Sequence, residues 1–270
     1  MVSKGNTLNC KKLFSLEGKI AIVTGGAGHL GSAISRTLAG FGAIVMVLGR
    51  REQALKDFVG QNRSGYGNRF KYFVCDVTDE NSFKKAVGET VDKYGAVDIL
   101  VNNAYAKQNE SFEELTKEAW SSALDNSLTH YFTCSKAISP IMLKKKSGSI
   151  INIASIYGFL GTDQRVYKPL GKKTPLHYSV AKGGILQMTH YLAMLWAEEG
   201  IRVNAVSPGV FPPKRGPERP DYMQELTTRV PLGRVGQPND LAGVIALLAS
   251  DASSYITGQN FIVDGGWSVW

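Results

Sequence analysis

The sequence predicts an α/β protein built on one parallel seven-stranded sheet with helices on both of its faces. Short runs rich in valine and isoleucine alternate with longer segments of helical apolar spacing along the whole chain. A glycine-rich turn joins the first apolar run to the first helical segment. The 270 residues, 43% of them apolar and 20% charged, suffice for one large domain with a buried core.

Each element follows from its own stretch of sequence. The short apolar runs predict strands near residues 20–24, 44–48, 70–75, 97–101, 149–154, 202–206 and 260–263. The amphipathic segments predict helices near residues 30–40, 52–59, 80–93, 117–143, 178–198 and 239–248. Strands that alternate with helices pair in parallel, so the sheet is expected to be doubly wound, as in a Rossmann-type fold.

The organisation of the chain points to a single domain over residues 1–270, because neither an internal repeat nor a low-complexity linker divides it. Residues 1–15 are expected to form an N-terminal extension. Two segments rich in glycine and proline, 161–177 and 208–226, follow predicted strands. Doubly wound sheets bind ligands at the carboxyl ends of their strands, so we expect both segments to be active-site loops.

Composition and charge exclude several classes of function. The net charge is +8, but the lysines are dispersed and form no basic stripe with aromatics, so no nucleic-acid partner is expected. No apolar run is long enough for a membrane span, and the N-terminus does not resemble a secretory signal. Three widely spaced cysteines, Cys10, Cys75 and Cys134, predict neither disulfides nor a metal site and suit the cytoplasm.

A dinucleotide site is predicted at the turn after the first strand. Gly25, Gly28 and Gly31 let the backbone turn tightly and approach a pyrophosphate at the helix N-terminus. The second predicted strand ends without the carboxylate that would hold an NAD ribose. It ends instead at Arg50 and Arg51, and an arginine binds a 2′-phosphate well. The sequence therefore favours NADP over NAD as the cofactor.

A catalytic pair is predicted at Tyr178 and Lys182. The two residues are four positions apart in a predicted helix and so share one face. A nearby ammonium favours the phenolate and is expected to lower the pKa of Tyr178. The tyrosine could then donate and accept protons near neutral pH.

Taken together, these features resemble the short-chain dehydrogenase/reductase family in its compact single-domain form, over residues 16–270. The matching segments are residues 24–31, Asp76-Val77, Asn102-Asn103-Ala104, Ser155, Tyr178 with Lys182, Ser207-Pro208-Gly209 and residues 263–266. The resemblance implies that Tyr178 is the general acid/base, that Lys182 binds the nicotinamide ribose, and that Ser155 holds the reacting oxygen.

The resemblance also assigns the cofactor contacts. Gly25, Leu30 and Gly31 would face the pyrophosphate. The remaining contacts would be Asp76 and Val77 at the adenine, Asn103 and Ala104 along the groove, and Pro208 with Gly209 near the nicotinamide. The family usually forms tetramers, so a homotetramer or homodimer is expected, with Trp267, Val269 and Trp270 suited to a subunit contact.

Four departures from the family pattern stand out. His29 occupies the place of a glycine, and Tyr105 replaces the glycine usual after Asn-Asn-Ala. Ser127, or Asn126 in a shifted helix, takes the place of an asparagine that orders a relay water. Ser155 and Tyr178 are 23 positions apart, farther than usual. The insertion, within residues 163–177, carries the cations Arg165, Lys168, Lys172 and Lys173 as well as His177.

The insertion and the C-terminal Val-Asp-Gly-Gly-Trp are similar to gluconate 5-dehydrogenases and to oxidoreductases of nonulosonic-acid pathways. This resemblance implies hydride transfer between a secondary alcohol and a ketone on a sugar, sugar acid or related polyhydroxylated substrate. The cations of the insertion would suit an anionic substrate of this class.

Two alternatives stay open. Residues 231–234 also resemble 3-oxoacyl thioester reductases of the acyl-carrier-protein type. A non-catalytic dinucleotide-binding scaffold or sensor is supported only by Ser127 in the asparagine position.

Overall fold

The computed structural model describes residues 8–105, 110–170, 174–213 and 220–270. It contains a seven-stranded sheet in the order β3-β2-β1-β4-β5-β6-β7, in which every neighbouring pair is parallel. The strands are β1 Ile20–Thr24, β2 Ile44–Gly49, β3 Phe70–Val74, β4 Ile99–Asn102, β5 Gly148–Ile153, β6 Ile201–Pro208 and β7 Asn260–Val263. The predicted fold class is confirmed.

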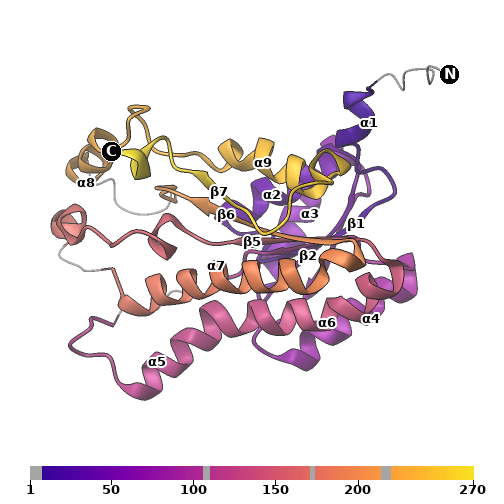
Figure 1. The fold of residues 1–270 in the computed structure, drawn as a ribbon, viewed down its shortest axis with the longest axis horizontal. Coiled ribbons are helices and arrows are strands. Elements are labelled where there is room, and N and C mark those ends of the chain that lie inside the picture. Colours follow the sequence, from indigo (N-terminus) through magenta and orange to yellow (C-terminus); the bar gives the residue numbers. More distant parts are fainter. Residues whose placement is uncertain (1–7, 106–109, 171–173, 214–219) are drawn as a thin grey trace.

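Helices cover both faces of the sheet. They are α1 Cys10–Phe14, α2 His29–Gly40, α3 Glu52–Tyr66, α4 Glu80–Tyr94, α5 Lys117–Leu124, α6 His130–Lys145, α7 Leu176–Trp196, α8 Pro220–Thr228 and α9 Ala242–Ala249. In Figure 1, α2, α3 and α9 lie on one side of the sheet, and α4, α6 and α7 lie on the other. No helix in the described part of the chain is long and apolar enough to cross a membrane.

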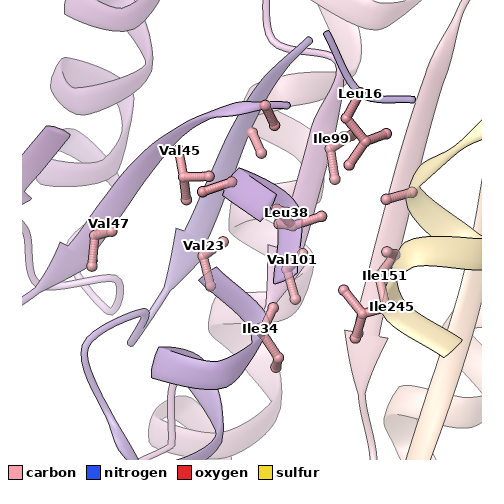
Figure 2. Close-up of a cluster of buried hydrophobic side chains, with 14 of the residues drawn as sticks. Leu16, Val23, Ile34, Leu38, Val45, Val47, Ile99, Val101, Ile151 and Ile245 are labelled. Atoms are coloured by element: carbon pink, nitrogen blue, oxygen red, sulfur yellow. The ribbon is translucent and has the colours of Figure 1, made fainter. Parts of the chain in front are cut away.

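The core on the α2 side shows how the sequence pattern becomes packing. Val23, Val45 and Val101 come from the adjacent strands β1, β2 and β4 and are fully buried against Ile34 and Leu38 of α2 (Figure 2). Burial of each such side chain stabilises the fold by about 1.5–3 kcal/mol. This packing fixes α2 against the strand that precedes it, and so fixes the glycine turn between them.

Four regions differ from the sequence expectation, and the first is α1, which lies within the expected N-terminal extension 1–15. The predicted helix 117–143 is two α-helices, α5 and α6, joined by a π-helical segment, Asp125–Thr129. Helix α3 continues past residue 59 to Tyr66, because the ring of Tyr66 packs on Phe70 of β3. Residues 220–226 of the predicted loop 208–226 belong to α8. A proline is well tolerated at the first position of a helix, so Pro220 begins a helix there instead of preventing one.

The strand order reverses between β1 and β4, since the chain runs from β1 to β2 and β3 on one side and returns to β4 on the other. Ligands of doubly wound sheets bind at such a switch point, outside the carboxyl ends of the strands. The segments that follow β1, β4, β5 and β6 therefore meet at one edge of the sheet.

Candidate active site

The turn between β1 and α2 has the geometry of an anion site. Gly25 adopts a φ of +62°, which favours glycine, and a Cβ on Gly31 would lie 2.1 Å from the Gly25 carbonyl oxygen. Gly28 caps α2 without a side-chain hydrogen bond. The first N–H groups of a helix have no partner within it, so those that open α2, including that of Leu30, are available to a phosphate. The residues therefore fit a pyrophosphate group.

A network behind the turn holds it in place. Asn103 donates through Nδ2 to the carbonyl oxygens of Thr24 at 2.9 Å and Gly25 at 3.2 Å. Thr24 Oγ1 accepts the backbone N–H groups of Asn103 at 2.9 Å and Ala104 at 3.0 Å. The Asn103 side chain thus supports the glycine turn from behind, while Ala104 borders the cleft in front of it.

A cleft of about 330 Å³ begins at this turn and extends along the carboxyl ends of β2 and β3. It is bordered by residues from all the predicted cofactor segments on this side, including Gly25, Gly28, Arg50, Arg51, Asp76, Val77, Ala104 and Tyr105. Arg50 is exposed at the end of β2. Burial would raise the pKa of Asp76, but hydrogen bonds from Thr78 and the charge of Arg50 lower it overall. The predicted adenosine residues are therefore brought together.

At the other end, the segment after β6 passes close to the segment after β7. The Gly209 N–H donates to the Val263 carbonyl at 2.9 Å, and a Cβ on Gly209 would lie 2.7 Å from the Asp264 Cα. His29, the residue in the place of a glycine, reaches this region, since its Nε2 lies 3.1 Å from the Phe211 carbonyl oxygen. Pro208 thus ends β6 beside Val263 of β7, and Gly209 follows it at the carboxyl edge of the sheet, which His29 links to the glycine turn.

Ser155 and Tyr178 meet at the end of β5. Ser155 is buried at the start of a short 3-10 helix, Ile156–Gly158, and its Oγ accepts the Tyr157 N–H at 3.2 Å. Tyr178 lies in the first turn of α7, half-buried, with its hydroxyl near the Ser155 hydroxyl. Residues 23 positions apart in the sequence are therefore adjacent.

The Lys182 ammonium is buried between Tyr178 and the sheet. Only 4% of Lys182 is exposed, and Nζ donates to the Ile153 carbonyl at 2.7 Å and to the Tyr131 hydroxyl at 3.4 Å. Tyr131 itself donates to the same carbonyl at 2.9 Å. Sequence reasoning missed Tyr131. Its position four residues after Ser127, on the same helical face, is the signal that could have found it.

The expected lowering of the Tyr178 pKa is not observed. Burial raises the pKa of Tyr178, and the Ser155 hydroxyl offsets this only in part. Burial also lowers the pKa of Lys182 to about 7. An ammonium that is only partly charged near neutral pH cannot favour the phenolate strongly, so desolvation dominates the pKa of both groups.

The side chains at the predicted relay position are engaged elsewhere. Ser127 is buried in the π-helical segment, where its hydroxyl donates to the Ala123 carbonyl. Asn126 donates to the Ser122 carbonyl at 2.8 Å and borders the cofactor cleft. Lys182 donates to Ile153 and Tyr131, and in the described part of the chain it makes no hydrogen bond to Ser127, which stays a predicted catalytic residue.

The described part of the insertion contains a 3-10 helix, Gln164–Leu170, which packs against α8. Asp163 pairs with Arg165 at 2.8 Å and with Arg229, which also bonds Glu225 of α8. Tyr167 donates to the Tyr157 hydroxyl at 2.9 Å. The charge of Arg165 is thus matched by Asp163.

Apart from Arg165, His177 is the one basic side chain of the insertion that the structure describes. His177 is buried, and burial lowers its pKa. Lys172 and Lys173 lie outside the described residues, as does the side chain of Lys168. Over residues 8–105, 110–170, 174–213 and 220–270, no group of three potential metal ligands comes together.

Comparison with known proteins agrees with this geometry. A family model described as enoyl-(acyl carrier protein) reductase matches residues 25–268. The chain is 34% identical over 252 residues to 3-oxoacyl-(acyl-carrier-protein) reductase FabG of Thermotoga maritima, covering 93% of this chain and 98% of the relative.

Two solved structures are also similar. One is a gluconate 5-dehydrogenase from Burkholderia cenocepacia J2315 in complex with NADP and tartrate, with a TM-score of 0.87 and 28% identity over 97% of this chain and 100% of that one. The other is the NADPH-dependent 3-quinuclidinone reductase from Rhodotorula rubra, with a TM-score of 0.87 and 27% identity over 100% of both chains. The chain therefore belongs to the short-chain dehydrogenase/reductase family of NAD(P)-dependent oxidoreductases.

Proposed function

We propose that this protein is a cytoplasmic, NADP-preferring oxidoreductase that interconverts a secondary alcohol and a ketone on a sugar, sugar acid or related polyhydroxylated small molecule. The observation that carries the proposal is the convergence of Ser155, Tyr178 and Lys182 at the carboxyl end of the sheet, beyond the cofactor cleft. The non-catalytic scaffold is the weaker alternative, because a binding module has no need for these three groups together.

The proposed mechanism assigns one task to each side chain. When bound, the nicotinamide cofactor supplies or accepts the hydride. In the oxidative direction, Tyr178 takes the proton of the substrate hydroxyl while the carbon loses its hydride. Ser155 holds the reacting oxygen, and the Lys182 ammonium stabilises the tyrosinate form of Tyr178 that accepts this proton. In reduction, Tyr178 returns the proton to the carbonyl oxygen.

The preference for NADP rests on the end of β2. Arg50 and Arg51 border the cleft, and the short segment from Gly49 to Arg51 contains no carboxylate that could bind a ribose 2′-hydroxyl. A guanidinium pairs with a phosphate through two parallel hydrogen bonds. The similar gluconate 5-dehydrogenase and 3-quinuclidinone reductase are named with NADP and NADPH, respectively, which supports the same choice.

The polyhydroxylated substrate is supported by the polar side chains beside the catalytic pair. The hydroxyls of Tyr157 and Tyr167 face each other where the insertion meets Ser155 and Tyr178, and can bind substrate hydroxyls. Selection of an anionic substrate would depend on the lysines of the insertion, because Arg165 is paired. We propose Lys172 and Lys173 for that role.

A 3-oxoacyl thioester is the second candidate substrate, and the observation that favours it is the 34% identity to a 3-oxoacyl-(acyl-carrier-protein) reductase. The deciding experiment is a turnover assay of the wild-type protein with NADP and NAD against polyols, sugar acids and acetoacetyl thioesters. We expect turnover of a polyol or sugar acid. Turnover of the thioester alone would select the second candidate, and binding of NADP without any turnover would select the scaffold.

We also propose that the protein is a homodimer or homotetramer. Large apolar side chains are exposed along one face of α7, among them Tyr191, Met194 and Leu195, and at the C-terminus at Val269 and Trp270. Exposed apolar patches of this kind mark contact surfaces. Size-exclusion chromatography coupled to light scattering tests the proposal by measuring the mass of the assembly. Met194→Glu should break a contact made by α7, and Val269→Glu should break a contact made by the C-terminus, so each variant should lower that mass.

A further inference from the structure

Tyr105 stands at the junction of the cofactor cleft and the catalytic pair. It follows β4 directly, and it borders the cleft. The backbone before it is held from two sides: the Ala104 N–H donates to Thr24 Oγ1 at 3.0 Å, and the Ala104 carbonyl accepts from His130 Nε2 at 3.0 Å. The direction in which the Tyr105 side chain leaves the sheet is therefore fixed.

The ring of Tyr105 packs on the catalytic tyrosine. The edge-to-face contact with Tyr178 has a centroid separation of 5.3 Å and an interplanar angle of 75°. This arrangement is the favourable one for aromatic pairs, because the positive edge of one ring meets the negative face of the other. Tyr105 therefore limits how far the Tyr178 ring can move.

The same ring also faces the Lys182 ammonium. Nζ lies 5.3 Å from the centroid of Tyr131, 5.8 Å from that of Tyr178 and 5.9 Å from that of Tyr105. Aromatic faces within about 6 Å attract a cation. Three rings, from the loop after β4, from α6 and from α7, thus lie around one ammonium.

Lys182 has few other partners. Two hydrogen bonds, to Ile153 and Tyr131, occupy two of its three N–H groups. Among the residues that the structure describes, no carboxylate forms an ion pair with it. A buried charge is costly unless it is paired, and the three rings offset only part of that cost.

We propose that Tyr105 is a positioning residue of the catalytic pair: its ring closes an aromatic cage that holds the Lys182 ammonium beside Tyr178 and keeps water away from both groups. The inference rests on the catalytic roles proposed above for Tyr178 and Lys182. Tyr105 acts through these two side chains and takes no part in the proton transfer itself.

Removal of the ring has a defined effect on the pH profile. Within the described part of the chain, the titratable groups that face Lys182 or Tyr178 are Tyr105 after β4, His130 and Tyr131 of α6, and Tyr157 and Tyr167 near Ser155. Burial keeps His130 neutral, with a pKa of about 4, so it does not titrate in the same range. Loss of Tyr105 admits water, which lowers the pKa of Tyr178 and raises that of Lys182. The lost ring attraction opposes the change at Lys182 only weakly, because 5.9 Å is close to the limit of such contacts.

The test compares Tyr105→Gly, which introduces the glycine usual at this position in the family, with Tyr105→Phe, which keeps the ring. We expect Tyr105→Gly to lower kcat and to move the midpoint of the alcohol-oxidation pH profile downward by about one pH unit. Tyr105→Phe should keep the wild-type midpoint. A midpoint that stays in place in Tyr105→Gly, or that moves equally in both variants, overturns the proposal.

A second readout does not need turnover and therefore separates this proposal from the proposed function. Acetylation of Lys182 by a water-soluble reagent, followed by mass spectrometry, reports how well the ammonium is shielded. We expect faster acetylation at residue 182 in Tyr105→Gly than in wild type or Tyr105→Phe, with Tyr255→Ala, which removes a fully exposed tyrosine, as the control. Equal acetylation rates in all four proteins overturn the cage even if no substrate is ever found. A protein with the expected rates but no turnover keeps the cage and loses the oxidoreductase function.

Discussion

Desolvation controls the two ionisable groups at the centre of the site. Burial alone lowers the pKa of Lys182 to about 7, and it raises the pKa of Tyr178 above its ordinary value. Both shifts favour the uncharged forms, whereas the proposed oxidation passes through a tyrosinate beside an ammonium. The hydrogen bonds that Lys182 donates to Ile153 and Tyr131 offset part of the cost of this charged pair.

The role of Tyr178 is tested by Tyr178→Phe. The phenyl ring packs as the phenol does but cannot transfer a proton, so kcat should fall by about 10²–10⁴-fold. Binding of NADPH, measured by fluorescence, should remain. Tyr255→Phe, at a fully exposed tyrosine, is the matched control and should keep its rate. A Tyr178→Phe protein with most of the wild-type kcat would remove this residue from the mechanism.

The choice of cofactor is tested by Arg50→Ala. Loss of a charge-assisted hydrogen bond costs about 1.5–3 kcal/mol, so the ratio of kcat/KM for NADP to that for NAD should fall roughly ten- to a hundredfold. Arg63→Ala, at the far end of α3, removes an exposed arginine of the same helix and should leave the ratio alone. If the wild-type protein prefers NAD, the interpretation of Arg50 is wrong.

The insertion and α8 act together at the scale of elements. Their contact combines the ion pair of Asp163 with Arg229 and the ring contact of Tyr167 with Tyr222, whose centroids are 6.1 Å apart. The Trp270 indole donates to the Arg229 carbonyl at 3.1 Å and so adds the C-terminus to the same unit. Figure 1 shows α8 and the chain end side by side. We propose that this unit covers the substrate.

Asp163→Asn tests that unit while keeping an acceptor oxygen. The variant loses the charge that pairs with Arg165 and Arg229, which weakens the contact between the insertion and α8. We therefore expect KM for the substrate to rise about two- to fivefold while KM for the cofactor stays the same. Glu80→Gln, which breaks an exposed pair with Lys84 on α4, serves as the control. Equal increases in both KM values would point to a general loss of stability.

At the scale of the whole molecule, the buried Lys182 that catalysis is proposed to need should lower the free energy of unfolding. The pKa of Lys182 is about 7 in the folded protein against the ordinary 10.5. Between these values the unfolded chain binds a proton that the folded protein does not. Folded-state stability is therefore lost as pH falls from 10.5 toward 7, and the whole deficit is present below pH 7.

Lys182→Met should consequently be inactive but more stable at neutral pH, in the absence of cofactor. The shift corresponds to at most about 5 kcal/mol, and the two lost hydrogen bonds cost about 1 kcal/mol each, which leaves a gain of about 2–3 kcal/mol. At pH 10 the wild-type protein has regained nearly all of the stability that burial of Lys182 costs, so the variant should be no more stable than wild type. Urea denaturation at both pH values measures this, and a variant less stable at both would contradict the buried charge.

Much of the fold follows from local patterns. The alternation of apolar runs and amphipathic segments determined seven parallel strands and their order along the chain. Gly25, Gly28 and Gly31 determined the glycine turn, and the spacing of Tyr178 and Lys182 determined that they share a helix face. These are interactions between residues a few positions apart, so the sequence by itself contains them.

Only the tertiary structure decided what surrounds those residues. Tyr105, Tyr131 and Tyr178 come from three segments that are separated in the sequence. Their meeting around Lys182 depends on how α6 packs beside β4 and β5 and how α7 packs beside β6. The rise in the Tyr178 pKa has the same origin. Charge spacing along one helix predicts a lower pKa, but desolvation is the sum of every neighbour that excludes water, and that sum exists only once the whole chain has folded.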